Sequence, residues 1–162
     1  QGQLIYAIGD IHGRSDLLAL LLDKIAADAA QGKEAKRRTL IFLGDYIDRG
    51  HDSRRVVDML LGALPQGFDA HFLKGNHEAI MLDFLEDPSF LGQWLANGAD
   101  ATVRSYGMDL EELIRKGATP DAWRSFSTSA DRFTISRQRF LYVLRPIQPR
   151  QKLTVSLNAS RA

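Results

Sequence analysis

The chain of 162 residues contains no cysteine, so it has neither a disulfide framework nor a thiolate metal site. It lacks any apolar run near the roughly 20 residues that a membrane-spanning helix needs, and we expect no membrane partner. Its net charge is only +1, which gives no general attraction to nucleic acid. The apolar share (44%) and the charged share (25%) are those of an ordinary globular protein. We therefore expect a cytoplasmic protein with no nucleic-acid partner; the oligomeric state stays open.

Two further absences concern the second half of the chain. Residues 132–162 contain seven Lys or Arg but no Asp or Glu, and no histidine follows His77. Such an asymmetry of charge is typical of a basic tail. The sequence therefore predicts a folded part at residues 1–131 and a divergent basic tail at residues 132–162.

Short apolar runs that alternate with helical patterns indicate the fold class. The strands are expected at residues 4–8, 39–43 and 70–73, a charged solvated connection at 33–38, and helices from Ser15 to about Gly32, from Ser53 to before Pro65, and from Ala79 to Leu85. Ser15 and Ser53 are the expected N-caps. This alternation predicts an α/β fold with a parallel sheet and right-handed crossovers.

A glycine-framed segment follows each expected strand. These segments are Gly9-Asp10-Ile11-His12-Gly13, Gly44-Asp45-Tyr46-Ile47-Asp48-Arg49-Gly50 and Gly75-Asn76-His77-Glu78. Ligands of parallel sheets bind beyond the carboxyl ends of the strands, so the three segments should meet there. Asp10 and His12, two residues apart on extended backbone, point the same way and can reach one ion. A carboxylate with an imidazole suits Mn, Fe or Zn better than Ca or Mg.

The other polar residues of these segments suit phosphate-ester chemistry. Asp45 can bridge two ions, and Asn76 adds an amide oxygen; paired ions with a shared ligand are a known device for phosphate esters. His77 would face the leaving group and give it a proton, with Asp48 orienting its other ring nitrogen. Arg49 offers a planar fork for phosphate oxygens, and Asn76 is expected to contact the substrate as well.

Each segment taken alone also fits an ordinary turn or a salt-bridged loop, and it is their combination that favours a metal site. Four other residues have simpler interpretations. His51 is interpreted as a solvent-facing loop residue, His71 as a packed or edge residue of a strand, and Trp94 and Trp123 as core residues.

The three segments match the signatures Gly-Asp-x-His-Gly, Gly-Asp-x-x-Asp-Arg-Gly and Gly-Asn-His-Glu without a substitution. With them the chain resembles the calcineurin-like metallophosphoesterases, and more narrowly the bacterial and bacteriophage Ser/Thr protein phosphatases, from about Leu4 to about Gly107. The resemblance implies an αββα sandwich with a dinuclear centre. It implies that Asp10, His12 and Asp45 bind one ion, that Asp45 and Asn76 begin the second site, that His77 is the proton donor with Asp48 as its partner, and that Arg49 binds phosphate.

The chain departs from the family pattern after these segments. The family completes its site with two histidines and an arginine from the C-terminal half, whereas the last histidine here is His77. The second metal site would then have only Asp45 and Asn76, so one ion is better supported than two, and the sandwich is expected to be incomplete. The tail after about Arg132 fits a frameshifted reading, a true divergence or a shortened chain; we favour the first or the last.

Three functions are consistent with these residues. The first is a metal-dependent phosphomonoesterase that acts on phosphoserine or phosphothreonine in proteins or on a small phosphate ester. The second is a hydrolase of dinucleoside polyphosphates, which would use the same site residues. The third is an inactive remnant that binds phosphate, one metal ion or a protein partner.

Overall fold

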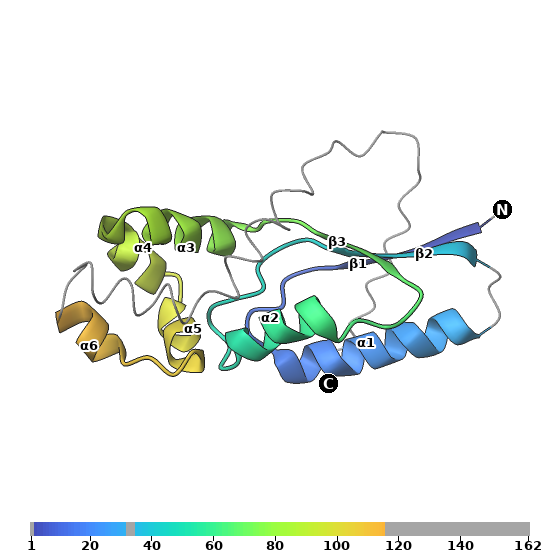
Figure 1. The fold of residues 1–162 in the computed structure, drawn as a ribbon, viewed down its shortest axis with the longest axis horizontal. Coiled ribbons are helices and arrows are strands. Elements are labelled where there is room, and N and C mark those ends of the chain that lie inside the picture. Colours follow the sequence, from blue (N-terminus) through green and yellow to red (C-terminus); the bar gives the residue numbers. More distant parts are fainter. Residues whose placement is uncertain (1, 32–34, 116–162) are drawn as a thin grey trace.

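The computed structural model describes residues 2–31 and 35–115. Figure 1 shows a small sheet with two helices along it and a group of helices beyond one of its ends. The expected boundary after residue 131, the basic tail and Trp123 lie outside the described residues.

The strands β1 (Gly2–Ile8), β2 (Ala35–Phe42) and β3 (Asp69–Phe72) form one parallel sheet in the order β1-β2-β3. The predicted parallel α/β sheet is confirmed. The last residues of the three strands, Ile8, Phe42 and Phe72, pair with one another across the sheet. The segments that follow the strands therefore leave the sheet at the same edge.

Strand β2 begins earlier than predicted. The sequence predicts a solvated connection at residues 33–38, whereas the strand starts at Ala35 and Arg37 pairs with Gln3 of β1. The Arg37 side chain is exposed and forms an ion pair with Asp69 of β3, with Nε 2.9 Å from Oδ2. A strand end whose side chains face solvent tolerates charged residues. The charge of this segment therefore led to a predicted strand start that is too late.

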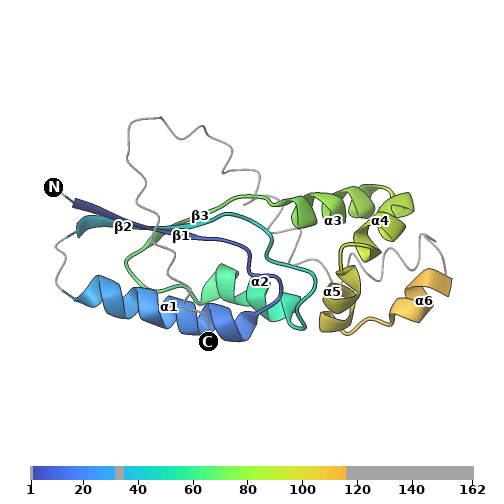
Figure 2. The same ribbon diagram turned by 180° about the vertical axis from the view of Figure 1, so that it is seen from behind.

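Helices α1 (Ser15–Ala30) and α2 (Ser53–Gly62) lie along the same face of the sheet (Figures 1 and 2). They bury an apolar core that includes Leu18 of α1 together with Leu40 and Phe42 of β2. Among the described residues no helix covers the opposite face (Figure 2). The described part contains one helical layer and one sheet of the expected αββα sandwich, so within the described residues the sandwich is incomplete, as predicted.

Further helices gather beyond the carboxyl ends of the strands (Figure 1). They are α3 (Asn76–Glu86), the 3-10 helix η1 (Pro88–Phe90), α4 (Leu91–Leu95), α5 (Ala99–Ser105) and α6 (Leu110–Arg115). Trp94 and Val103 are fully buried and extend the core into this group. Within the described ranges, none of the helices is both long and apolar enough to cross a membrane.

The expected N-caps Ser15 and Ser53 are wrong. Each serine is the first residue inside its helix, and neither helix has a side-chain cap. The Ser15 hydroxyl instead donates to Oδ2 of Asp52 at 2.8 Å. The Ser53 hydroxyl contacts the backbone N–H of Asp48 at 3.2 Å and Oγ1 of Thr102 at 2.9 Å. Both hydroxyls connect separate elements, a role that local sequence does not reveal.

Helix α3 begins at Asn76, before the predicted start at Ala79. Gly75 precedes it in an extended conformation, and its N–H donates to the Glu78 carboxylate at 2.9 Å. This contact closes the first turn of the helix around the third glycine-framed segment. His77 is thus held on a helix rather than on a loop.

Candidate metal centre and active site

The first two glycine-framed segments are joined by backbone hydrogen bonds. The N–H groups of Ile11 and His12 donate to the carbonyl of Asp45 at 3.0 and 2.9 Å, and that of Gly13 donates to the carbonyl of Tyr46 at 2.8 Å. These bonds continue the pairing of β1 with β2 beyond the strand ends. They fix the backbones that carry His12 and Asp45 relative to each other.

Two glycines permit contacts that no side chain would allow. A Cβ added at Gly50 would lie 2.0 Å from the carbonyl oxygen of His12, and one added at Gly75 would lie 2.1 Å from Oδ1 of Asp45. Both distances are far below van der Waals contact, and the partners are backbone or a candidate ligand atom. Glycine frames these segments because their backbones touch.

Four non-glycine residues have left-handed backbone conformations in the described part of the chain. They are His12 (φ +44°), Asp45 (+54°), Asp48 (+70°) and Arg49 (+67°). Such conformations cost on the order of 1–3 kcal/mol each and persist only where the surroundings impose them. All four belong to the residues that the sequence predicts for the site, so the strain is concentrated there.

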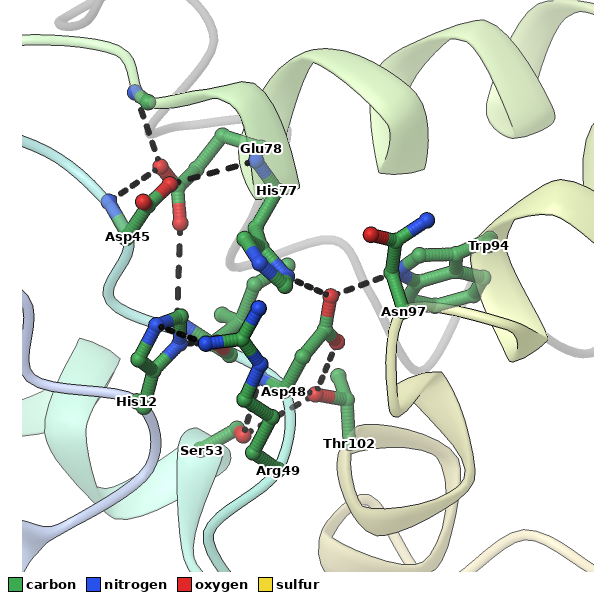
Figure 3. A network of polar contacts seen from close by, with 12 residues as sticks. His12, Asp45, Asp48, Arg49, Ser53, His77, Glu78, Trp94, Asn97 and Thr102 are labelled. Carbon is green, nitrogen blue, oxygen red and sulfur yellow. Dashed lines mark hydrogen bonds and ion pairs between the residues drawn. The ribbon is translucent and has the colours of Figure 1, made fainter.

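The side chains of His12, Asp45 and His77 form a cluster that could hold a metal ion (Figure 3). One ligand atom from each lies within 4.8 Å of the other two. Nδ1 of His12 donates to the carbonyl of Ile47 at 3.0 Å, which leaves the lone pair on Nε2. Imidazole nitrogens with a carboxylate oxygen suit a first-row divalent ion. The residues present therefore fit the metal that the sequence predicts.

The other two predicted ligands lie at the margin of this cluster. Oδ2 of Asp10 is 3.7 Å from Nε2 of His12, and its side chain is 68% exposed. Asn76 is the exposed first residue of α3, adjacent to His77. The cluster includes His77, for which the sequence predicts proton transfer instead of metal binding. The ligand roles of Asp10 and Asn76 stay predictions.

Arg49 reaches the same cluster from the side of α5. Its Nη1 lies 3.1 Å from Nε2 of His12, and its backbone N–H donates to the carbonyl of Gly98 at 3.0 Å. The side chain is exposed, so its remaining N–H groups face solvent at the edge of the cluster. A guanidinium in this position can hold phosphate oxygens by paired hydrogen bonds.

The predicted pair of His77 and Asp48 is in direct contact. Nδ1 of His77 donates to Oδ2 of Asp48 at 2.8 Å, and both side chains are almost completely buried. The carboxylate holds the ring with its Nδ1–H toward Asp48, which leaves Nε2 for the cluster. Burial raises the pKa of Asp48, while hydrogen bonds from Thr102, His77 and Trp94 act in the opposite direction.

Glu78 organises the site, although its sequence pattern alone predicted no role for it. Its buried carboxylate accepts the backbone N–H groups of Asp45 (2.8 Å), Tyr46 (2.8 Å) and Gly75 (2.9 Å). It thereby joins the second segment to the third. Burial raises the pKa of Glu78, and the amides that it accepts oppose this shift. The sequence feature that could have indicated this role is an acidic residue in the first turn of a helix that directly follows a glycine.

Trp94 and Thr102 supply further contacts that the sequence pattern did not predict. Trp94 is a core residue, as interpreted, and packs against Phe84 with ring centroids 5.1 Å apart. Its indole N–H also donates to Oδ2 of Asp48 at 3.0 Å, and Oγ1 of Thr102 donates to Oδ1 of Asp48 at 2.7 Å. Both residues lie far from Asp48 in sequence, so spacing gave no signal.

Comparison with known proteins identifies the family to which this site belongs. The family model described as calcineurin-like phosphoesterase matches residues 4–148. The chain belongs to the calcineurin-like phosphoesterase family. The resemblance carried by the three segments is confirmed, and the match to the family model continues past Gly107, the predicted end of the resemblance.

Several curated relatives of this chain have named activities. Serine/threonine-protein phosphatase BSL2 of Arabidopsis thaliana is 33% identical over 50% of this chain and 8% of its own length. Bis(5'-nucleosyl)-tetraphosphatase PrpE of Oceanobacillus iheyensis is 33% identical over 67% of this chain and 44% of its own. Zinc-dependent endopolyphosphatase of Saccharomyces cerevisiae is 34% identical over 54% and 24%. The chain spans less than half the length of each of these relatives.

Proposed function

We propose that the chain carries the site of a metal-dependent hydrolase of phosphate monoesters, with phosphoserine or phosphothreonine in proteins as its substrate. The observation behind the proposal is the cluster of His12, Asp45 and His77, with Arg49 at its edge and His77 held by Asp48. Similarity to protein phosphatases such as BSL2 supports this substrate class.

The metal-binding part of the proposal follows the donor atoms. Asp10, His12 and Asp45 hold one divalent ion, for which manganese, iron or zinc suits the mixed nitrogen and oxygen donors. Asp45 and Asn76 begin a second site, which has fewer side chains. A bound ion would supply a water of lowered pKa and stabilise charge on the phosphoryl oxygens.

The remaining residues act on the substrate itself. Because Nδ1 of His77 is bound to Asp48, Nε2 is the ring nitrogen that can give a proton to the leaving-group oxygen. Arg49 holds phosphoryl oxygens and thereby orients the ester. In this proposal His77 and its partner Asp48 are the catalytic pair, and Arg49 and Asn76 bind the substrate.

Hydrolysis of dinucleoside polyphosphates is the second candidate. It is favoured by the tetraphosphatase relative of Oceanobacillus iheyensis, which matches 67% of the chain. The same ligands, proton donor and arginine would serve this reaction. A third candidate, an inactive protein that binds phosphate or one metal ion, is favoured by the absence of any histidine after His77.

Titration of the purified chain with Mn²⁺ tests the proposed ligands. Calorimetry should show about one tight equivalent, because the first site has three side-chain ligands and the second has two. His12→Ala should abolish this binding, since it removes a nitrogen donor from the cluster. His77→Asn should keep it, because His77 is proposed as a proton donor.

The matched control is His51→Ala, which removes an exposed histidine and should leave binding unchanged. Two equally tight equivalents would show that further ligands complete the second site. Loss of Mn²⁺ binding in His77→Asn would make His77 a metal ligand and contradict its proposed role.

Hydrolysis assays test the substrate class. With Mn²⁺ the chain should release phosphate slowly from a phosphoserine peptide, and EDTA or Asp45→Asn should stop the reaction. Faster cleavage of diadenosine tetraphosphate than of the peptide would favour the second candidate. Metal binding without any hydrolysis would favour the third candidate.

A cytoplasmic location of the protein stays a prediction.

A further inference from the structure

Every polar atom of the Asp48 carboxylate has a defined donor. Oδ2 accepts from Nδ1 of His77 at 2.8 Å and from Nε1 of Trp94 at 3.0 Å, and Oδ1 accepts from Oγ1 of Thr102 at 2.7 Å (Figure 3). The Asp48 side chain has no exposed surface. A buried carboxylate is costly without such partners, so Trp94 and Thr102 compensate for its loss of hydration.

Thr102 holds the backbone of Asp48 as well as its side chain. Its Oγ1 accepts the Asp48 N–H at 2.8 Å while it donates to the carboxylate. The Thr102 hydroxyl has one proton, and that proton is used on the carboxylate, so the nearby Ser53 hydroxyl at 2.9 Å is the donor of their contact. These bonds fix a residue whose backbone is left-handed.

The turn between α4 and α5 also touches Arg49, the residue that follows Asp48. The Gly98 carbonyl, between Trp94 and Thr102 in sequence, accepts the backbone N–H of Arg49 at 3.0 Å. A Cβ on Gly98 would lie 3.0 Å from Cγ of Arg49. Helices α4 and α5 therefore pack directly on the second glycine-framed segment.

We propose that Trp94 and Thr102 are positioning residues of the phosphoesterase site, which hold the Asp48 carboxylate where it fixes His77 with Nδ1–H toward Asp48 and Nε2 toward the cluster. This inference rests on the proposed function. In this inference, α4 and α5 orient the proton donor His77 through Asp48. Trp94 and Thr102 themselves contact neither metal nor substrate.

The test removes one donor at a time from the full chain. Thr102→Val keeps the shape of the side chain but removes the hydroxyl, Trp94→Phe removes the indole N–H, and Thr102→Ser retains the hydroxyl. The matched control is Thr39→Val, at a buried threonine of β2 whose hydroxyl has no partner among the described residues. Nitrogen NMR of the histidine rings, with His77 assigned by its loss in His77→Asn, reports the tautomer at a pH where the rings are neutral.

Wild type, Thr102→Ser and Thr39→Val should show His77 in the Nδ1–H form alone. Thr102→Val and Trp94→Phe should show a mixture of tautomers. Their kcat for phenyl phosphate should fall about 10- to 100-fold with KM unchanged, the range typical for groups that orient a functional histidine. Thr102→Ser should restore kcat.

An unchanged tautomer in both donor-removing variants would overturn the inference, and would leave the proposed hydrolase untouched. If Thr102→Val and Trp94→Phe both failed to fold while Thr102→Ser folded, the contacts would serve stability alone. That result would also overturn the inference. Conversely, a wild-type chain that binds Mn²⁺ but hydrolyses nothing would contradict the proposed function, while the NMR result would still stand.

Discussion

Replacement of Glu78 with alanine is expected to lower the free energy of unfolding by about 3–5 kcal/mol. The substitution leaves the backbone N–H groups of Asp45, Tyr46 and Gly75 without their acceptor. Water can enter part of the space, so the loss stays below the sum for three fully unsatisfied groups. Urea unfolding followed by circular dichroism measures the change. The tight Mn²⁺ equivalent should disappear too, because Asp45 loses its fixed backbone.

Glu86→Ala is the matched control, since it removes an exposed glutamate at the other end of the same helix. Its effect should stay within about 1 kcal/mol, as for most exposed charged groups. Glu78→Gln should fall between the two, because the amide keeps one acceptor oxygen. If Glu78→Ala were as stable as the wild type, the backbone bonds between the first two segments would suffice to hold the loops.

The parallel sheet and the meeting of the three segments were predictable because both follow from local pattern. Apolar runs mark the strands, and parallel order places their carboxyl ends at one edge. That edge brings His12, Asp45 and His77 within reach of one another. The pair of His77 and Asp48 was also predictable, since a buried functional histidine needs a partner for its other nitrogen.

The supporting contacts were not predictable, because they depend on how distant elements pack. The hydroxyls of Ser15 and Ser53 follow the sequence rule for helix caps, yet tertiary partners take them. Thr102 has no local feature that indicates a bond to Asp48, 54 residues away. The start of β2 at Ala35 likewise depends on pairing with β1, which outweighs the charge of the residues there.

Replacement of His77 with asparagine should slow hydrolysis of phenyl phosphate far more than hydrolysis of p-nitrophenyl phosphate. Phenolate is a poorer leaving group than p-nitrophenolate and depends more on a proton donor. Loss of general-acid catalysis typically costs roughly 10²–10⁴ in rate, and most of this should appear with phenyl phosphate. Steady-state kinetics with saturating Mn²⁺ measure both rates, which should already be low in the wild-type chain.

The control His71→Asn, at an exposed histidine of β3, should leave both rates unchanged. Asp48→Asn should reproduce the leaving-group dependence of His77→Asn, because the amide no longer stabilises the charged imidazole through Nδ1. Equal slowing of the two substrates in His77→Asn would instead indicate damage to metal or phosphate binding, since these affect both esters alike. That result would make His77 a metal ligand instead of a proton donor. Its position near His12 and Asp45 is compatible with metal binding.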